Sequence, residues 1–273
     1  MRPSFISSIF LLLSFINQAQ ELEFKTKLSI DAKTDFLDLD QFGNIYLVLD
    51  DELRKLDANG KFLSSYSDPV QGSISQIDLL NPMNPLIYYQ NSNLLRLLDN
   101  RLNQSREYNL SFQFQDPKNL AASNGNRIWL YDQNADRMLL YDLDQEKVLN
   151  RSPLLSKLIN ERKPVVLNSQ SGFDQVVVLI QLDEKQKFLI FDAQGAFENE
   201  IELPFELKSW DYYNGQIIVL YNNNSLQVHK IDGAKSDLII CPLAEAEEIF
   251  YHAPTVFLRT KNQLHQYRWI DSR

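Results

Sequence analysis

The sequence predicts an all-β fold, a six-bladed β-propeller whose blades are four-stranded antiparallel sheets, and three observations lead to it. A short strand-like segment that ends in aspartate recurs along the whole chain. A second series of short apolar segments keeps the same spacing, ahead of the first. The last repeat is one strand short, while one additional strand precedes the first repeat. We therefore expect the N-terminal strand to join the last blade and close the ring, which protects both sheet edges.

The segments that end in aspartate give the period of the repeat. Their final residues are Asp57, Asp99, Asp142, Asp192, Asp232 and Asp271, separated by 42, 43, 50, 40 and 39 positions. Propeller blades repeat at about 40–45 residues, so each interval predicts one blade. The interval of 50 contains an insertion, residues 153–164, which is bounded by prolines and is expected to form a helical turn. Such an insertion belongs either to a binding face or to a loop without function.

The second series predicts strands that are buried on both faces. Its segments are continuously apolar and rich in β-branched and aromatic residues, and they span 45–49, 86–89, 128–131, 176–180, 217–221 and 256–258. Each segment is too short for a helix and lacks the helical period. Because two series keep one period, we interpret the repeat as a structural unit.

The first repeat shows how one blade is divided. We expect its four strands at 36–40, 45–49, 52–56 and 62–67. The joints at 41–44 and 57–60 contain glycine and asparagine, which tolerate the positive φ angles of tight turns. The additional N-terminal strand is expected at 22–30.

Residues 1–19 are expected to form a signal peptide, and residues 20–273 a single propeller domain. Arg2 precedes an apolar run at 5–16, and the small residue Ala19 suits cleavage. The run is shorter than the roughly 20 residues of a membrane-spanning helix, although an uncleaved anchor is the alternative. No later stretch is apolar enough to span a bilayer, so we expect no membrane span in the mature chain. This pattern predicts an exported protein that is periplasmic, otherwise associated with the cell envelope, or secreted.

Charge and cysteine content limit the classes of partner. The chain has 27 basic and 36 acidic residues, a net charge of −9, which argues against binding nucleic acid or anionic lipid through bulk electrostatics. Cys241 is the only cysteine, so no intramolecular disulfide is possible and the core alone must stabilise the fold. We expect Cys241 to be a buried hydrophobic residue, because it ends a strand-like segment with no evident basic neighbour.

Two repeats share a longer motif, in which a Gly-Asn turn precedes an apolar strand that ends in aspartate and is followed by arginine. The motif spans residues 40–50 with Arg54 in the first repeat, and residues 125–132 with Arg137 in the third. The other four repeats keep the hydrophobic rhythm but lose the turn or the arginine. The motif resembles the NHL-type repeat and the related TolB-like six-bladed propellers of exported bacterial proteins. Such propellers range from binding scaffolds to lactonases, so the resemblance implies the architecture and not an activity.

A candidate metal site lies in the predicted central channel. Aligning the inner strands on the second strands places six residues at similar depth, namely Asp38, Leu79, Ala121, Asn168, Asp211 and Phe250. Asp38, Asn168 and Asp211 offer the oxygen ligands that hard cations such as Ca²⁺ prefer. The resemblance to lactonase-type propellers implies a cation at such a position. In the alternative interpretation, the chain has no cofactor and these groups bind channel water or backbone donors.

A second candidate site is aromatic. We expect Trp210, Tyr213, Tyr251 and His252 near one rim of the ring, where they would bind a sugar or a peptide, although such residues also pack as core. We predict no catalytic residues, because the chain lacks a Gly-x-Ser-x-Gly elbow and any phosphate-binding glycine motif.

These observations favour a binding protein over an enzyme. The leading hypothesis is an exported, non-catalytic scaffold propeller that docks a protein partner in the bacterial cell envelope through a face of polar loops, which include residues 90–93, 132–136, 183–186 and 222–224. The alternatives are a metal-dependent hydrolase or lactonase with a cation in the channel, and a carbohydrate- or peptide-binding propeller. Metal content with lactone turnover tests the first alternative, and glycan binding that depends on Trp210 tests the second.

Overall fold

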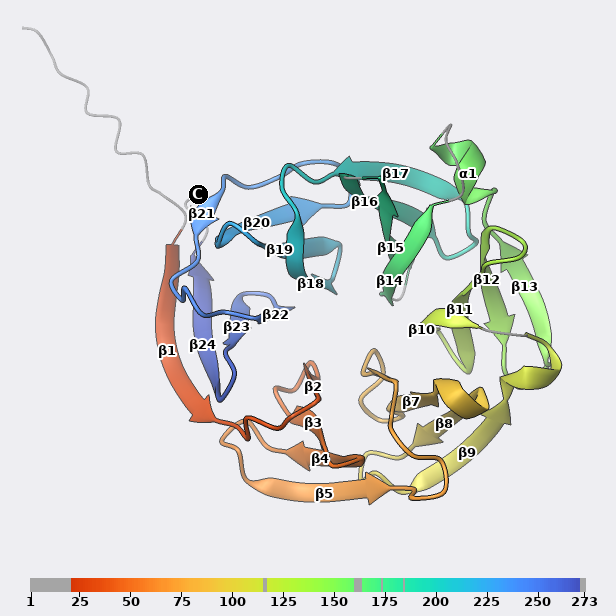
Figure 1. Cartoon of the computed structure of the whole chain (residues 1–273), viewed down its shortest axis with the longest axis horizontal. Coiled ribbons are helices and arrows are strands. Elements are labelled where there is room, and N and C mark those ends of the chain that lie inside the picture. The colour runs from red at the N-terminus through yellow and green to blue at the C-terminus, as the bar shows by residue number, and fades with distance from the viewer. Residues whose placement is uncertain (1–20, 115–116, 160–163, 173, 184, 271–273) are drawn as a thin grey trace, which may run out of the picture.

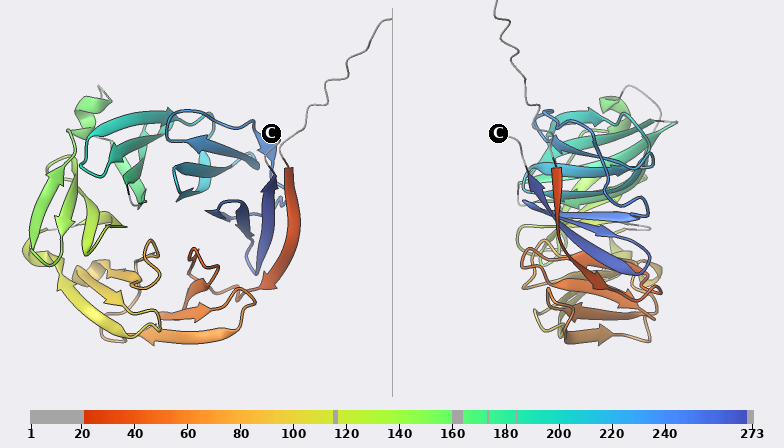
Figure 2. Two further views of the ribbon diagram at one scale, coloured as in Figure 1. Left: turned by 180° about the vertical axis from the view of Figure 1, so that it is seen from behind. Right: turned by 90° about the vertical axis from the view of Figure 1, so that its left-hand side faces the viewer.

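Six four-stranded antiparallel sheets stand around a central channel in the computed structural model, which describes residues 21–270 except 115–116, 160–163, 173 and 184 (Figure 1). A view from the side shows that the ring is wide and shallow (Figure 2). The all-β class, the number of blades and the number of strands in each blade are therefore confirmed. The predicted signal peptide lies outside the described residues.

Each of the first five blades runs outward from the channel in chain order. Blade 1 contains β2 (Phe36–Leu39), β3 (Ile45–Leu49), β4 (Glu52–Leu56) and β5 (Phe62–Ser67). Blade 2 contains β6 (Gln76–Asp78), β7 (Leu86–Tyr89), β8 (Leu94–Leu98) and β9 (Gln104–Asn109). Blade 3 contains β10 (Lys118–Ser123), β11 (Arg127–Asp132), β12 (Arg137–Asp142) and β13 (Lys147–Arg151).

The remaining blades follow the same plan. Blade 4 contains β14 (Val165–Ser171), β15 (Gln175–Leu182), β16 (Lys185–Asp192) and β17 (Phe197–Glu202). Blade 5 contains β18 (Leu207–Tyr213), β19 (Gln216–Tyr221), β20 (Ser225–Lys230) and β21 (Ile239–Ile240). Blade 6 contains β22 (Glu248–His252), β23 (Thr255–Arg259) and β24 (Gln263–Ile270), and its outermost strand is β1 (Glu21–Ser29).

The ring is closed by pairing between the two ends of the chain. β1 lies antiparallel to β24 along its whole length, from Leu22 opposite Trp269 to Leu28 opposite Leu264. Beyond the strand, the backbone N–H of Ile30 donates a 2.9 Å hydrogen bond to the carbonyl of Asn262. Figure 2 shows the two strands side by side at the edge of the disc. The predicted closure is confirmed.

The core consists of apolar layers between neighbouring blades. In one layer, Tyr46 and Val48 of blade 1 pack with Ile87 and Tyr89 of blade 2, and all four are buried. Such layers form because the second strand of each blade is apolar on both faces, as β3 and β7 show. The apolar segments of the second series therefore form the core between the blades.

The aspartates that end the repeated segments cap the turn between the third and fourth strands. Oδ1 of Asp57, Asp99 and Asp192 accepts hydrogen bonds from the backbone N–H groups two and four residues later, at 2.8–2.9 Å. A short side-chain acceptor stabilises such a turn locally. These repeated aspartates thus have a structural role in the turns. Asp271, the last aspartate of the series, lies outside the described residues.

The insertion between blades 3 and 4 forms the helical turn α1 (Leu155–Leu158). Leu155 is fully buried in the layer that contains Trp129, and the backbone N–H of Ser156 donates to Asp136 Oδ2 at 3.0 Å. Figure 1 places α1 at the outer edge of the ring, away from the channel. Its described part therefore packs against the blades rather than lining the candidate site.

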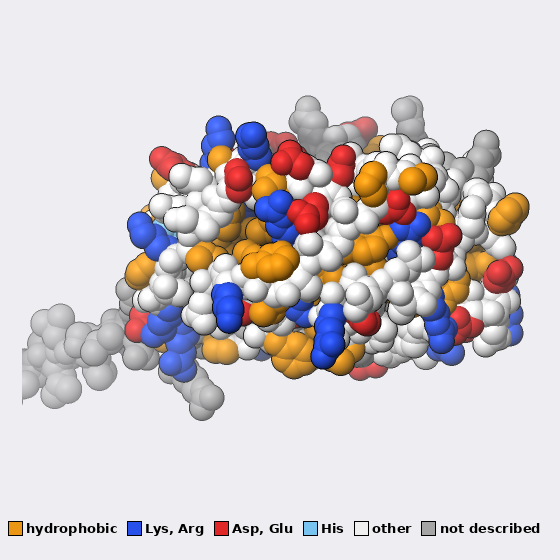
Figure 3. Space-filling model, turned by 90° about the horizontal axis from the view of Figure 1, so that it is seen from below, with side chains coloured by type: hydrophobic (Ala, Val, Ile, Leu, Met, Phe, Trp, Pro, Cys, Tyr) orange, Lys and Arg blue, Asp and Glu red, His pale blue; other side chains and the backbone are white. Residues whose placement is uncertain are grey.

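The outer surface has no dominant charge on the side formed by blades 1 and 2. Figure 3 shows basic and acidic side chains scattered across it, with hydrophobic side chains between them. Phe62 and Leu63 on β5 belong to this surface and remain about half exposed. Single exposed hydrophobic residues are ordinary on a soluble surface, so we assign no site here.

Gly60→Ala is expected to destabilise the protein by about 1 kcal/mol more than Gly125→Ala. Both glycines have positive φ angles, +81° and +71°, so an alanine is strained at either position. At Gly60 the added Cβ would also lie 2.6 Å from Leu28 Cδ1 on the closing strand, whereas at Gly125 it meets open space. Chemical unfolding of the two variants measures the difference, and equal losses would contradict the contact between this turn and β1.

Candidate binding site in the central channel

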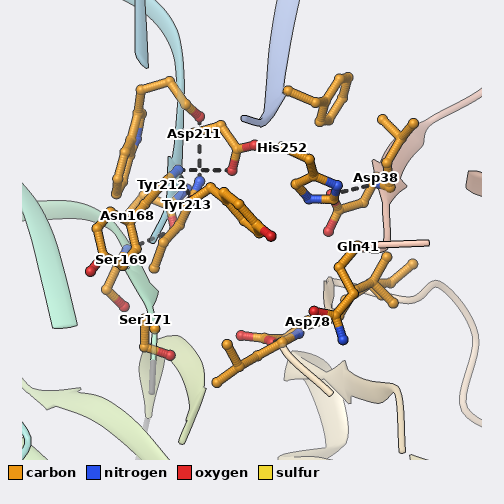
Figure 4. Close-up of a pocket in the computed structure, with 18 of the residues that line it drawn as sticks. Asp38, Gln41, Asp78, Asn168, Ser169, Ser171, Asp211, Tyr212, Tyr213 and His252 are labelled. Carbon is orange, nitrogen blue, oxygen red and sulfur yellow. Dashed lines mark hydrogen bonds between the residues drawn. The ribbon is translucent and has the colours of Figure 1, made fainter. Parts of the chain in front are cut away.

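The inner strands enclose a cavity of about 540 Å³ in the central channel. Its acidic lining residues are Asp38, Asp78, Asp174, Asp211 and Glu248. Aromatic and amide side chains complete the wall, and Figure 4 shows Asp38, Asp78 and Tyr213 directed toward the same space. Since ligand sites in proteins are typically concave with a few convergent polar groups, the cavity is the candidate site.

Three of these aspartates occupy the same position in their inner strands. Asp38 lies opposite Tyr46, Asp78 opposite Leu86 and Asp211 opposite Ile218, each near the start of the second strand of its blade. Strand alternation explains their direction, because the residues just before them in the chain, Leu37, Ile77 and Trp210, are buried between blades. The repeat therefore brings one carboxylate from each of three blades to the channel.

Two of the three aspartates connect neighbouring blades. The backbone N–H groups of the next inner strand donate to them, from Ala122 to Asp78 Oδ2 at 2.7 Å and from Tyr251 to Asp211 Oδ2 at 2.6 Å. Gln170 of blade 4 plays the same part, since Oε1 accepts from the Tyr212 N–H at 2.8 Å. Inner strands are sheet edges, and these side chains accept hydrogen bonds from the backbone of the neighbouring blade.

Asp38 makes no such connection to blade 2 within the part of the chain that the structure describes. Its Oδ1 accepts from the backbone N–H of the adjacent Leu39 at 2.7 Å. It stands at the position from which Asp78 and Asp211 reach the next blade. Of the three carboxylates, Asp38 therefore contributes least to the contacts between blades.

Burial raises the pKa values of the three channel aspartates. For Asp38, burial raises the pKa well above its usual range, and the negative charge of Asp211 is the second cause of this shift. Burial raises the pKa of Asp78, and that of Asp211 to about 7, although in both cases backbone N–H groups oppose the shift. Glu248 has a basic partner, since Arg259 Nη1 lies 2.7 Å from its Oε2. Perturbed carboxylates in a cavity are typical of functional sites.

The cavity has no basic side chain to balance these carboxylates. Among the described residues that line it, none is lysine or arginine. The described residues also contain no group of three or more His, Cys, Asp or Glu side chains placed to share a metal ion. Asn168, the third predicted metal ligand, lines the same cavity as Asp38 and Asp211, and its Oδ1 accepts from the Ser169 N–H at 2.7 Å. The cation site at Asp38, Asn168 and Asp211 therefore stays a prediction.

The alignment of inner strands is shifted at two positions. In blade 2 the residue opposite the second strand is Asp78 and not Leu79, which follows the end of β6. In blade 4 a register shift between Val166 and Asn168 leaves Gln170 as the residue that reaches the next blade. Sequence analysis therefore missed Asp78. The signal was present in the alternation of Gln76-Ile77-Asp78, which matches the pattern around Asp38.

The predicted aromatic residues separate into two pairs. Trp210 lines the cavity but is only 7% exposed and packs against Phe188 at 4.8 Å between ring centres. Tyr251 is buried outside the cavity lining and donates to Gln216 Oε1 at 2.6 Å. Tyr213 and His252 instead lie together, 5.0 Å between ring centres, and both line the cavity. Burial lowers the pKa of His252, while the Asp40 carboxylate and a hydrogen bond to the Asp40 backbone oppose that shift. Ligand binding by these four residues stays a prediction.

Comparison with known proteins supports the architecture alone. No family model matches the chain, and no curated protein matches it. The chain is similar in structure to a streptogramin B lyase, at 12% identity over 90% of this chain and 98% of the other, with a TM-score of 0.58. It is also similar to virginiamycin B lyase from Staphylococcus aureus, at 13% identity over 88% and 81%, with a TM-score of 0.59. A chain of the mitotic checkpoint complex matches at 10% identity over 99% of both chains, with a TM-score of 0.59.

The fold is a propeller. At these identities the structural neighbours carry no activity over to this chain, and the resemblance to NHL-type and TolB-like propellers stays a prediction. Within the described part of the chain, no helix has both the length and the apolar character needed to cross a membrane.

Proposed function

We propose that this chain is an exported, non-catalytic binding propeller of the bacterial cell envelope, which docks a protein partner by receiving a lysine or arginine side chain in the channel. One observation carries the proposal: Asp38, Asp78 and Asp211 face a single cavity whose described lining contains no lysine or arginine. Export rests on the signal peptide expected at residues 1–19. The structural neighbours contribute only the fold.

The charge of the cavity favours a cation over a neutral ligand. Carboxylates that are partly removed from water gain most from an opposite charge that enters the same low-dielectric space. His252 does not oppose such a ligand near neutral pH, because burial lowers the pKa of His252 and favours the neutral ring. A guanidinium or ammonium group on a flexible stem can reach carboxylates inside a channel. We predicted docking at the polar loops between the second and third strands. Those loops lack the concentration of acidic side chains that the cavity has.

Linear peptides selected from a random display library on residues 20–273 are expected to be enriched in lysine or arginine. Asp38→Asn should weaken binding of a selected synthetic peptide at least ten-fold at pH 8, as expected when one partner of a buried charge pair is removed. Affinity for the unsubstituted protein should rise between pH 6 and pH 8, because Asp211 ionises with a pKa of about 7. Titration calorimetry at both pH values measures these effects.

Asp99→Asn is the matched control, since it removes the same charge from an exposed turn outside the cavity. It should leave peptide affinity unchanged. Selected peptides without enrichment in basic residues, or an affinity that Asp38→Asn does not alter, would overturn the proposed function.

A metal-dependent hydrolase is the second candidate, favoured by the fact that Asp38, Asn168 and Asp211 line one cavity. Metal analysis of the purified protein, thermal unfolding with added Ca²⁺ or Zn²⁺ and a screen of lactone substrates separate it from the binding protein. A bound ion with turnover that Asp38→Asn abolishes would favour the hydrolase.

A further inference from the structure

A second pocket of about 290 Å³ lies at the seam where blade 6 meets blade 1. We call it the seam pocket, and its apolar lining residues are Leu28, Phe42, Ile45, Ala58, Phe257 and Leu264. They come from the closing strand, the β2–β3 turn, the start of β3, the β4–β5 turn and the strands β23 and β24 of blade 6. The closing strand β1, which pairs with β24 in blade 6, supplies Leu28 to the wall of the pocket.

The turn beside the seam pocket holds an aromatic side chain in solvent. Phe42 is 66% exposed, although large apolar residues are usually turned inward. The turn is held by Asp40, whose Oδ1 accepts from the N–H groups of Phe42 and Asn44, both at 2.9 Å. Asp40 Oδ2 also accepts from the Tyr46 hydroxyl at 3.2 Å. Phe42 is thus presented by a turn whose conformation is set before any ligand arrives.

The seam pocket adjoins the acidic channel. Gln41 and His252 line both cavities. Figure 4 shows these two side chains near Asp38 on the channel side. The two cavities together form a site that is acidic at one end and apolar at the other.

We propose that the seam pocket receives a large apolar side chain of the same partner segment whose lysine or arginine enters the channel. The inference rests on the proposed function and adds the sequence character of the partner, a linear segment with a basic residue and an apolar residue a few positions apart. Charge complementarity places the basic residue among the aspartates and leaves the apolar residue for the adjoining pocket. A pocket near the lower end of the roughly 300–1,000 Å³ range of ligand sites suits one side chain, and buried apolar anchors often dominate peptide affinity.

The test uses a peptide selected on residues 20–273 and its derivative with the apolar residue replaced by alanine. Phe42→Ser removes an apolar wall, and Ala58→Trp fills the pocket from an exposed position outside the channel cavity. Each should weaken the parent peptide at least ten-fold and leave the alanine derivative nearly unchanged. Asp38→Asn should weaken both peptides.

Phe112→Ser is the matched control, because Phe112 is 86% exposed and lines neither cavity. It should leave the affinity of both peptides unchanged, and thermal unfolding verifies that every variant is folded. Peptides that require a basic residue and Asp38 but tolerate Phe42→Ser and Ala58→Trp would overturn this inference and leave the proposed function standing. A selection without basic peptides would overturn the proposed function, and this inference with it.

Discussion

A protein that begins at residue 30, and so lacks β1 (Glu21–Ser29), is expected to lose at least about 5 kcal/mol of its free energy of unfolding. The strand forms eight paired positions with β24. Leu22 packs against the core between blades 5 and 6, and Leu28 against the core between blades 6 and 1. Each backbone hydrogen bond contributes about 1 kcal/mol, and each of the two partly buried leucines adds about 1. Domains of this kind are stable by only about 5–15 kcal/mol, so the shortened protein should be unfolded or marginally stable. Circular dichroism during heating measures the loss.

A protein that begins at residue 20 keeps the closing strand and is the matched control. Its unfolding temperature should lie well above that of the shortened protein. A synthetic peptide of residues 21–30 should restore stability to the shortened protein when added in excess, because binding to the folded state alone stabilises it. Equal unfolding temperatures with and without β1 would contradict the closure of the ring by this strand.

The architecture could be predicted because its determinants are local and repeated. Strands β3, β4 and β5 were predicted to the residue, since each is a short apolar or alternating segment between glycine and asparagine turns. Closure followed from counting strands, as the last repeat has three and one precedes the first. Even the insertion was predicted as a helical turn from its flanking prolines, and α1 is that turn.

The site was predictable only in part, because contacts between blades decide it. Asp38 and Asp211 were expected in the channel from their position before an apolar strand. Asp78 was missed because β6 has three residues and two leucines follow it, so the register depends on a bond to Ala122 in the next blade. No local pattern in the sequence predicts the seam pocket, whose walls join Leu28 and Phe42 to Phe257 across the whole length of the chain.

Asp38→Asn is expected to stabilise the protein at pH 8. Burial, followed by the charge of Asp211, raises the pKa of Asp38 well above its value in an unfolded chain. The folded state therefore binds more protons than the unfolded state between these two pKa values, and stability falls as the pH rises through the folded-state pKa. Asparagine removes this loss and keeps the acceptor for the Leu39 N–H. The gain should vanish near pH 4 and grow toward pH 8 in urea unfolding experiments.

Asp99→Asn should instead destabilise the protein at pH 8. Hydrogen bonds from Asn103 hold the pKa of Asp99 below its usual value, so ionised Asp99 contributes stability above pH 4. A gain for Asp38→Asn that is equal at pH 4 and pH 8 would show that charge is not its cause, and a loss at pH 8 would show that Asp38 supports the fold.

A carboxylate that lowers stability where it stands is characteristic of residues kept for function. If a basic peptide supplies the missing charge, its addition at pH 8 should raise the unfolding temperature of the unsubstituted protein more than that of Asp38→Asn. The stability cost and the binding energy would then originate in the same side chain.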